Sequence, residues 1–206
     1  MNITTDDFKK FSRYMIKYKF ALEEVNTKLK ILNEEFQLIH DHNPIEHIKS
    51  RLKKPESTFE KLIRKGFEPT FENAERYIKD IAGVRVTCSF ITDIYKVYDI
   101  IQKQDDIEVV EVKDYIANPK ENGYESLHLL VKIPVFLSDC VEKVLVEIQI
   151  RTIAMDFWAS LEHKIYYKFD KDVPSSLTAE LKEAAEMVHY LDYKMKDIKE
   201  KISEYK

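Results

Sequence analysis

The octapeptide Val-Leu-Val-Glu-Ile-Gln-Ile-Arg at residues 144–151 decides the fold, because it separates into two chemically different faces when it is read with a period of two. One face is wholly apolar and consists of Val144, Val146, Ile148 and Ile150. The other face consists of Leu145, Glu147, Gln149 and Arg151. This alternation predicts a β-strand with one buried face. The polar residues either face water, as in any half-exposed strand, or place a carboxylate, an amide and a guanidinium on one patch.

The composition of the whole chain is that of a soluble globular protein. Of its 206 residues, 44% are hydrophobic and 34% are charged. No apolar run approaches the ~20 residues that cross a bilayer, and the N-terminus lacks a signal-peptide pattern. Cys88 and Cys140 lie in apolar segments without metal-ligand spacing. We therefore expect buried free thiols, a cytoplasmic location and no membrane partner.

The charge of the chain is unevenly distributed. The formal net charge of -4 argues against a general nucleic-acid binder. Residues 49–65, however, hold seven basic residues against two acidic ones, which indicates an anionic partner such as a small polyphosphate or a nucleic acid. The chain has only three glycines and no Gly-rich phosphate loop. Side chains must therefore hold any phosphate that binds.

Two long helices are predicted near the ends of the chain, over residues 6–40 and 176–204. Apolar residues recur there in alternating steps of three and four, which is typical of a helix with one apolar stripe. The first stripe runs from Phe8 to Ile39. Such a stripe can pack either on the rest of the chain or against a neighbouring subunit.

Two prolines follow the first long helix. Pro44 and Pro55 are each expected to open a short helix as its first residue. Gly66 is expected to end the second of these helices, because glycine readily adopts the left-handed conformation of a helix C-terminus. Another helical turn or two is expected over residues 71–79.

Alternation predicts three strands besides the one at 144–151. They lie at residues 81–88, at 108–115, and at 124–133 after the Asn122-Gly123 turn. A helix with Thr92 or Asp93 as its N-cap is expected to run to about residue 104. Another helix is expected over residues 152–168.

Each predicted strand carries polar residues on the face opposite its apolar one, and together they are Arg85, Lys113, Tyr124, His128, Glu147 and Gln149. If these faces coincide, Asp80 and Glu147 place two carboxylates on one surface. The basic residues that would wall this surface are Arg51, Lys53, Lys61 and Arg64. Paired carboxylates beside a basic groove suit Mg²⁺ held jointly by protein and phosphates, and an exposed tyrosine can stack on a base. The residues thus indicate a Mg²⁺-dependent phosphoryl or nucleotidyl transferase, without identifying its substrates.

Four stretches of the chain resemble motifs of one known family. They are residues 50–53 with Ser57 and Lys61, residues 79–85, residues 113–128, and residues 147–152. The chain is similar here to the synthetase domain of the RelA/SpoT family, and specifically to the stand-alone small alarmone synthetases. The resemblance covers residues 44–168, and several motifs in the right order are far more specific than any one alone.

The resemblance implies a reaction and assigns residues to it. In this family the 3′-hydroxyl of GDP or GTP attacks the β-phosphate of ATP, pyrophosphate is transferred, AMP leaves, and the alarmones of the stringent response are formed. Asp80 and Glu147 would hold Mg²⁺, and Glu147 would also act as general base. The residues assigned to ATP are Arg51, Lys53, Ser57, Lys61, Arg64 and Arg85. The residues assigned to the guanine nucleotide are Lys113, Lys120, Asn122, Tyr124, His128 and Gln149, with Tyr124 stacking on the base.

The resemblance also implies an architecture. The expected fold is of the α+β class, with a mixed β-sheet flanked by helices and related to nucleotidyltransferases. We expect one domain over residues 1–206, with its core at 44–168 between the two terminal helices. Those helices are expected to form a homotetramer. An RNA partner is left open, without a feature that supports it.

Two positions depart from the family pattern. Glu125 stands where many small synthetases carry arginine, which bears on the choice of acceptor. Asp156 replaces an asparagine that one subtype uses for an allosteric alarmone, which favours the other subtype.

The rival hypothesis is a catalytically silent relative that binds nucleotides or RNA. Loss of Asp80 or Glu147 would have supported it, and both are present.

Overall fold

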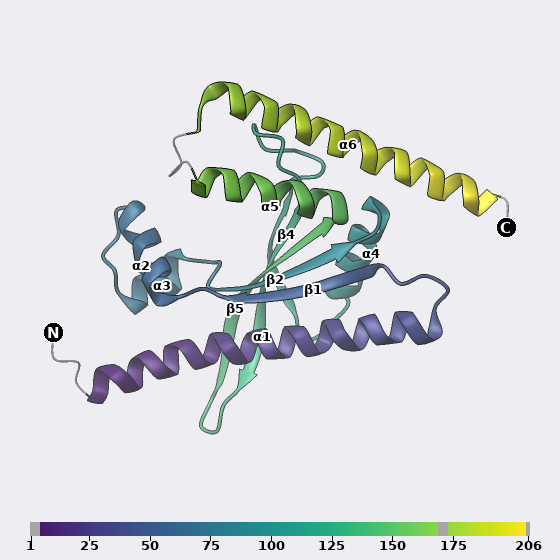
Figure 1. Cartoon of the computed structure of the whole chain (residues 1–206). Helices are drawn as coiled ribbons and strands as arrows, with labels where there is room; N and C mark the ends of the chain where they lie inside the picture. The colour runs from purple at the N-terminus through teal and green to yellow at the C-terminus, as the bar shows by residue number, and fades with distance from the viewer. Residues whose placement is uncertain (1–4, 169–172, 205–206) are drawn as a thin grey trace.

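A five-stranded mixed β-sheet forms the centre of the molecule in a computed structural model that describes residues 5–168 and 173–204 (Figure 1). The strands are β1 (Ile45–Leu52), β2 (Ala82–Cys88), β3 (Glu108–Asp114), β4 (Leu127–Phe136) and β5 (Val141–Thr152). Their order in the sheet is β1-β2-β5-β4-β3. Only the β2–β5 pair among them is parallel. The predicted α+β class with a mixed sheet is confirmed.

Strand β5 is the middle strand of this sheet, and its alternation is confirmed. The four apolar residues of its inner face, Val144, Val146, Ile148 and Ile150, are at most 3% exposed. Full burial of such a side chain contributes roughly 1.5–3 kcal/mol relative to an exposed one. This face therefore fixes the register of β5, since a slip of one residue would turn Glu147 and Gln149 into the core.

The segment after Pro44 corrects one prediction. It forms the edge strand β1, antiparallel to β2, and not a helix. The Asn43 side chain accepts a hydrogen bond from the Ile45 backbone N–H and starts the strand. Most side chains of β1 are exposed, so the strand lacks the apolar alternation that would have revealed it.

Helix α1 (Thr5–Ile39) packs along β1, β2, β4 and β5 (Figure 1). Its buried apolar side chains include Tyr18, Leu22, Val25, Leu29 and Phe36. The central part of the predicted apolar stripe of α1 thus packs against the sheet of the same chain. Phe8 and Phe11 lie outside the described side chains, and Ile39 is 75% exposed.

Two short helices, α2 (Pro55–Arg64) and α3 (Phe71–Tyr77), follow β1. Helix α2 opens at Pro55 and ends before Gly66, whose φ of +79° is the left-handed conformation expected there. Both predictions for α2 are confirmed. The helix expected over residues 71–79 is also present.

Helix α4 (Ile91–Gln102) lacks the predicted cap. Its N-cap is Phe90, and neither Thr92 nor Asp93 caps the helix with its side chain. Asp93 is buried and instead accepts a hydrogen bond from Lys199 at 2.9 Å and lies 2.9 Å from the His42 ring. The Asp93 carboxylate therefore pairs with Lys199, which is distant in sequence, and does not cap helix α4.

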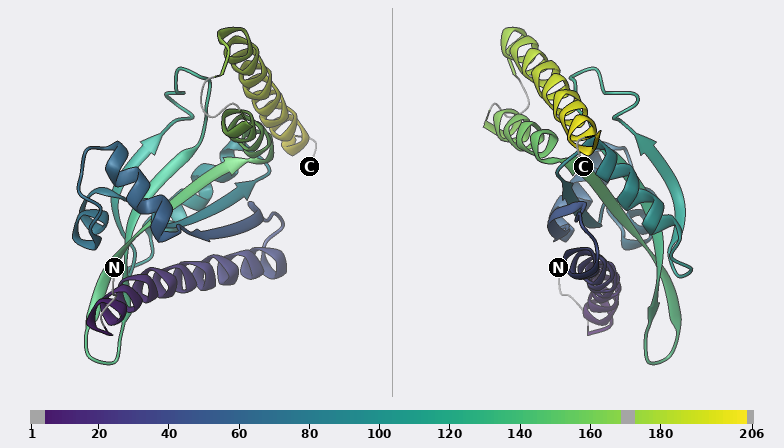
Figure 2. Two further views of the ribbon diagram at one scale, coloured as in Figure 1. Left: turned by 60° about the vertical axis from the view of Figure 1, so that its left-hand side comes forward. Right: turned by 90° about the vertical axis from the view of Figure 1, so that its right-hand side faces the viewer.

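Helices α5 (Ile153–Lys168) and α6 (Ser175–Glu204) lie side by side, away from α1 (Figure 2). The Trp158 indole donates to the Leu181 carbonyl at 2.8 Å. Thr152 caps α5 by accepting from the Met155 N–H, and it donates to Asp192 of α6 at 2.6 Å. These polar contacts fix α6 on α5.

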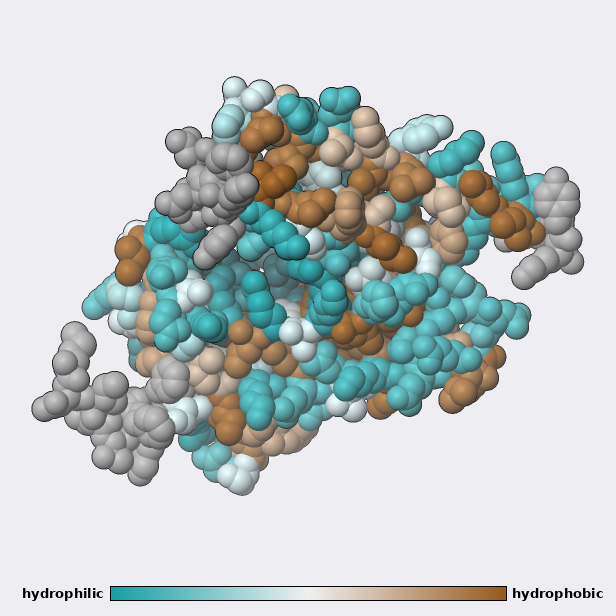
Figure 3. All heavy atoms as spheres, in the orientation of Figure 1, coloured by the Kyte–Doolittle hydropathy of each residue, from teal (hydrophilic) through white to brown (hydrophobic). Residues whose placement is uncertain are grey.

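Helix α6 exposes many apolar side chains, and brown atoms lie along the side of it that is turned toward the viewer in Figure 3. The exposed ones are Met187, Tyr190, Leu191, Tyr193, Met195, Ile198 and Ile202. Here the stripe predicted for the last helix is only partly covered by the chain itself. None of the helices in the described ranges has both the length and the apolar character needed to cross a bilayer.

The two cysteines differ from the prediction in one respect. Cys88 is buried, as expected, but Cys140 is only half-buried. Cys140 lies in the turn between β4 and β5, where its backbone carbonyl accepts from Leu137. Both thiols are free.

Replacing Asp192 by Asn should raise the melting temperature at pH 7.5. Burial raises the pKa of this carboxyl to about 6, although the Thr152 hydroxyl partly opposes the shift. Because the folded pKa lies above the unfolded one, the protein gains stability as the pH falls from about 6 toward the unfolded value of 3.8, which amounts to about 1.4 kcal/mol by pH 5.0. Thermal unfolding at pH 7.5 and 5.0 should show a smaller difference in the variant than in the wild type.

The exposed α6 residue Glu186 provides the matched control, because Glu186→Gln should leave both melting temperatures nearly unchanged. A lower melting temperature of Asp192→Asn at pH 7.5 would show that the charged carboxylate stabilises the fold.

Candidate active site

Two adjoining cavities lie on the polar side of the sheet. The first has a volume of about 460 Å³ and the second of about 570 Å³. The three side chains that line both are Asp80, Glu147 and Gln149. Each cavity is large enough for a small ligand. The arrangement therefore suits two ligands that meet at a pair of carboxylates.

The register of the sheet places these groups. In the parallel pair β2–β5, Gly83 lies opposite Glu147 and Arg85 lies opposite Gln149. In the antiparallel pair β4–β5, His128 lies opposite Gln149. Asp80 lies two residues before the start of β2 and thus close to Glu147. Polar side chains predicted from separate strands do share one surface.

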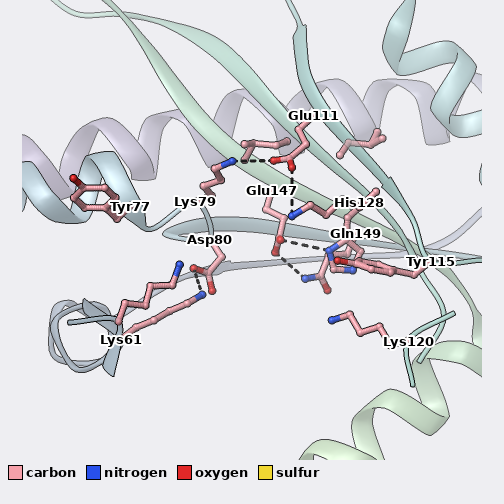
Figure 4. A pocket seen from close by; sticks show the side chains of 14 residues that line it. Lys61, Tyr77, Lys79, Asp80, Glu111, Tyr115, Lys120, His128, Glu147 and Gln149 are labelled. Atoms are coloured by element: carbon pink, nitrogen blue, oxygen red, sulfur yellow. Dashed lines mark hydrogen bonds and ion pairs between the residues drawn. The ribbon is translucent and has the colours of Figure 1, made fainter. Parts of the chain in front are cut away.

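Asp80 is held by two lysines, of which Figure 4 shows Lys61. Lys61 donates to Oδ1 and Lys53 donates to Oδ2, each at 2.8 Å. Burial raises the pKa of this carboxyl, but the two hydrogen bonds and the two positive charges outweigh burial and lower the pKa to about 2. Asp80 is consequently ionised at any physiological pH.

Glu147 has a partner at each oxygen (Figure 4). Its Oε1 lies 3.5 Å from His128 Nδ1, and its Oε2 accepts from the Gln149 amide at 2.8 Å. Burial would raise the pKa of Glu147, but these partners outweigh burial and lower it. This carboxylate is therefore also charged, next to the one at Asp80.

The first cavity contains charged residues that sequence reasoning did not assign. Glu111 accepts from Lys79 at 2.9 Å and lies 3.4 Å from the Lys113 ammonium. Lys120 lies 4.7 Å from the ring centres of both Tyr115 and Tyr124. Glu111 and Lys113 are two positions apart on β3, so their side chains lie on the same face of the sheet. This spacing was a signal that could have identified Glu111.

The second cavity is walled by β1, β2, β5 and α5. Its lining includes the basic residues Lys49, Arg51, Arg85, Arg151, His163 and Lys164. Arg51 and Arg85 were predicted for the site, whereas the α5 residues were not. Their contribution depends on α5 folding back beside the sheet, which no local pattern predicts.

Tyr124 stands between the two cavities. It lines the second cavity, but its ring contacts those of Tyr115 and His128, which line the first. Its hydroxyl lies within hydrogen-bond distance of His128 Nε2, at 2.8 Å, and accepts from Arg151. The side chain is half-buried, so part of the ring stays accessible.

Four predicted residues do not line either cavity, namely Lys53, Ser57, Arg64 and Asn122. The Arg64 side chain is exposed. The Asn122 amide donates to Glu162 of α5 at 3.0 Å. Lys53 reaches the site through its contact with Asp80.

The two departures from the family pattern have structural roles outside the cavities. Glu125 is 7% exposed and accepts a hydrogen bond from His189 of α6 at 2.7 Å. Asp156 lies 2.9 Å from Arg85 and 3.3 Å from Arg151. Neither carboxylate lines the first cavity.

The comparisons with known proteins agree with this geometry. Residues 50–172 match the model for the "Region found in RelA / SpoT proteins". The chain belongs to the RelA/SpoT family. It is 58% identical to the GTP pyrophosphokinase YwaC of Bacillus subtilis, across 91% of this chain and 90% of that protein.

Solved structures of this family resemble the fold closely. The small alarmone synthetase 2 of Bacillus subtilis gives a TM-score of 0.85 at 55% identity, with 93% of this chain and 98% of that chain covered. The small alarmone synthetase 1 of the same organism, bound to its product pppGpp, gives 0.89 at 38% identity, with 95% and 99% covered. The family resemblance read from the motifs is thereby confirmed.

Proposed function

We propose that this chain is a (p)ppGpp synthetase of the stringent response, which transfers pyrophosphate from ATP to the 3′-hydroxyl of GDP or GTP and releases AMP. The observation that carries the proposal is the pair of cavities that share Asp80 and Glu147. A two-substrate transfer needs both nucleotides next to the same reacting groups. The names of the relatives, GTP pyrophosphokinase and small alarmone synthetase, support this assignment.

The second cavity is assigned to ATP and the first to the acceptor. Arg51 and Arg85 line the second cavity. Lys53 and Lys61 donate hydrogen bonds to Asp80, which lines both cavities. The acceptor residues Lys113, Lys120 and His128 line the first cavity, with Gln149 at the boundary. Tyr124, between the two, is assigned to stack on the guanine. For Ser57, Arg64 and Asn122 the assignment depends on the resemblance alone.

The reaction can be followed on this geometry. The acceptor 3′-oxygen attacks the β-phosphorus of ATP, the bond from that phosphorus to the α–β bridging oxygen breaks, and AMP leaves. Glu147 is ionised and lies where it can take the proton of the hydroxyl. Lys53 and Lys61 lie where they can stabilise the charge that develops on phosphate oxygens.

The donor set fits a metal that is shared with the substrates. No cluster of three or more potential metal ligands occurs among the residues the structure describes, so the chain would supply Asp80 and Glu147 and the phosphates the remaining ligands. When bound, Mg²⁺ would neutralise phosphate charge.

Location and assembly belong to the same proposal. We assign the protein to the cytoplasm because ATP and GTP are available there. A homotetramer through the terminal helices is supported by the exposed apolar face of α6.

The alternative, a catalytically silent relative that binds nucleotides or RNA, is disfavoured because both carboxylates are present and ionised. Incubation with ATP, GDP and Mg²⁺, followed by nucleotide separation, decides between them.

The variants Asp80→Asn and Glu147→Gln should each abolish pyrophosphate transfer while the fold stays intact. Each removes one of the two charges that face the reacting phosphates. Product formation at saturating Mg²⁺ and circular dichroism measure the two effects. Near-normal turnover in either variant would exclude that carboxylate from the reaction.

Tyr124→Ala should weaken binding of the guanine nucleotide far more than that of ATP. Stacking of a base on an aromatic ring contributes roughly 1–3 kcal/mol, which corresponds to about 5- to 150-fold in affinity. Steady-state kinetics with each nucleotide varied in turn separate the two substrates. Tyr124→Phe keeps the ring and should retain most of the acceptor affinity. Equal rises in both Michaelis constants would instead indicate a structural role.

Light scattering at micromolar concentration should show a homo-oligomer. Leu191→Glu and Met195→Glu place charges on the exposed apolar face of α6 and should reduce the molecular mass. The control Glu186→Lys changes an exposed residue of the same helix and should leave the mass unchanged. A stable monomer of the unmodified chain would refute the assembly.

A further inference from the structure

The loop between β3 and β4, residues 115–126, packs directly on helix α6, and we call it the Tyr124 loop after the site residue that it carries. Gly123 makes a close approach to the helix. Its φ of +83° is a left-handed conformation that favours glycine, and a Cβ atom at this position would lie only 2.5 Å from the Cβ of Ala185. The loop and the helix therefore leave no room for a side chain at this point.

Glu125, on the other side of Tyr124, also faces the helix. Its Oε1 lies 2.7 Å from Nδ1 of His189, which is one helical turn after Ala185 on the same face of α6. The Glu125 side chain is 7% exposed, and its Oε2 has no hydrogen-bond partner among the residues that the structure describes. The contact with His189 therefore compensates for the burial of this carboxyl group.

This contact holds the loop in one place, because its loss would leave a buried carboxyl group without a partner. Burial raises the pKa of Glu125, and the contact with His189 opposes that shift. A buried polar group without a partner is strongly unfavourable. The cavity that borders Glu125, Trp158 and Val188 measures only about 10 Å³, so the surroundings of the carboxyl group are closely packed.

Tyr124 thus lies between two neighbours that are both fastened to α6. Its ring packs against Trp158, Ala159 and Ala185 at the junction of α5 and α6, and it lines the second cavity. A residue whose two neighbours are fixed on a helix cannot move relative to that helix without breaking their contacts. The place of the Tyr124 ring at the cavities therefore depends on the contact between the loop and α6.

The arginines assigned to ATP are positioned differently. Arg51 and Arg85 belong to β1 and β2, which pair with each other in the sheet. Helix α6 packs mainly on α5 and α4. A change in the contact between the Tyr124 loop and α6 should therefore affect the acceptor nucleotide more than ATP.

We propose that Glu125 and His189 are positioning residues that clamp the Tyr124 loop on α6 and thereby set the affinity for the guanine nucleotide. This inference rests on the proposed function for the identity of the acceptor, whereas the hold on the loop can be measured in the free protein. A contact that only stabilised the fold would affect both nucleotides alike.

The test begins with His189→Ala, which removes the partner on α6 and alters no residue that lines either cavity. We expect the dissociation constant of GDP, measured by calorimetry without ATP, to rise about five- to tenfold through loss of part of the base stacking. The dissociation constant of ATP should change less than about twofold. Amide hydrogen exchange of residues 115–126 in the free protein should become at least about threefold faster, with that of β2 unchanged.

Conservative variants separate the hydrogen bond from the bulk of the side chains. An amide both donates and accepts, so His189→Asn and Glu125→Gln should each keep the GDP dissociation constant within about threefold of the unmodified chain. Glu125→Leu removes the bond and should act as His189→Ala does. Combining these two should weaken GDP binding no further, because both act through one contact. Glu186→Ala alters an exposed residue of the same helix and is the control that should change nothing.

A GDP dissociation constant within about twofold of the unmodified chain in His189→Ala or Glu125→Leu would overturn the clamp. Unchanged exchange of the loop would do so as well, and so would equal weakening of GDP and ATP without recovery in His189→Asn. The two variants alter different elements, so either one decides the question if the other fails to fold. If the unmodified chain makes no alarmone, the proposed function fails, but hydrogen exchange still decides whether this pair holds the loop.

Discussion

The parallel pairing of β2 with β5 is the constraint on which the rest of the structure depends. It places Gly83 beside Glu147 and Arg85 beside Gln149, and it puts Asp80, just before β2, close to the centre of β5. Parallel neighbours cannot be joined by a tight turn, so α4, β3 and β4 must intervene in the chain. Strand β4 then returns to β5 from the other side and adds His128 to the same surface.

Electrostatic balance determines what this surface can bind. The chain as a whole carries a net charge of -4, yet the walls of both cavities are rich in lysine and arginine. Within the chain, Asp80 neutralises Lys53 and Lys61, and Asp156 is shared by Arg85 and Arg151. Nucleotide phosphates can take over such contacts at little cost, because the cations are already positioned and partly desolvated.

Helices α5 and α6 add contacts that link the site to the outside of the molecule. Glu125 follows Tyr124 directly and is held by His189 of α6, while Thr152 follows Arg151 and is held by Asp192. The positions of Tyr124 and Arg151 thus depend on how α6 lies.

The sequence by itself determined the elements whose cause is local. The alternation in β5, the stripes of α1 and α6, the Pro55 start of α2 and its end before Gly66 all follow from period and backbone preference. The ordered motifs were enough to identify the family. That Asp80 and Glu147 share one surface was expected only on the condition that the polar faces of the strands coincide, and the pairing of β2 with β5 meets this condition.

Only the tertiary structure decided the features that depend on a distant partner. Strand β1 was missed because an exposed edge strand has no apolar period, and its conformation comes from pairing with β2. Asp93 is no cap because helix α4 already begins at Ile91, and its carboxylate instead accepts from Lys199, which is 106 residues away. Glu125 and Asp156 lie outside the cavities because α6 and two arginines hold them. Arg151 was visible as one polar residue of an alternating strand. Its four partners, however, come from β5 itself, from the loop before β4 and from α5, and a burial that only packing creates makes their hydrogen bonds obligatory.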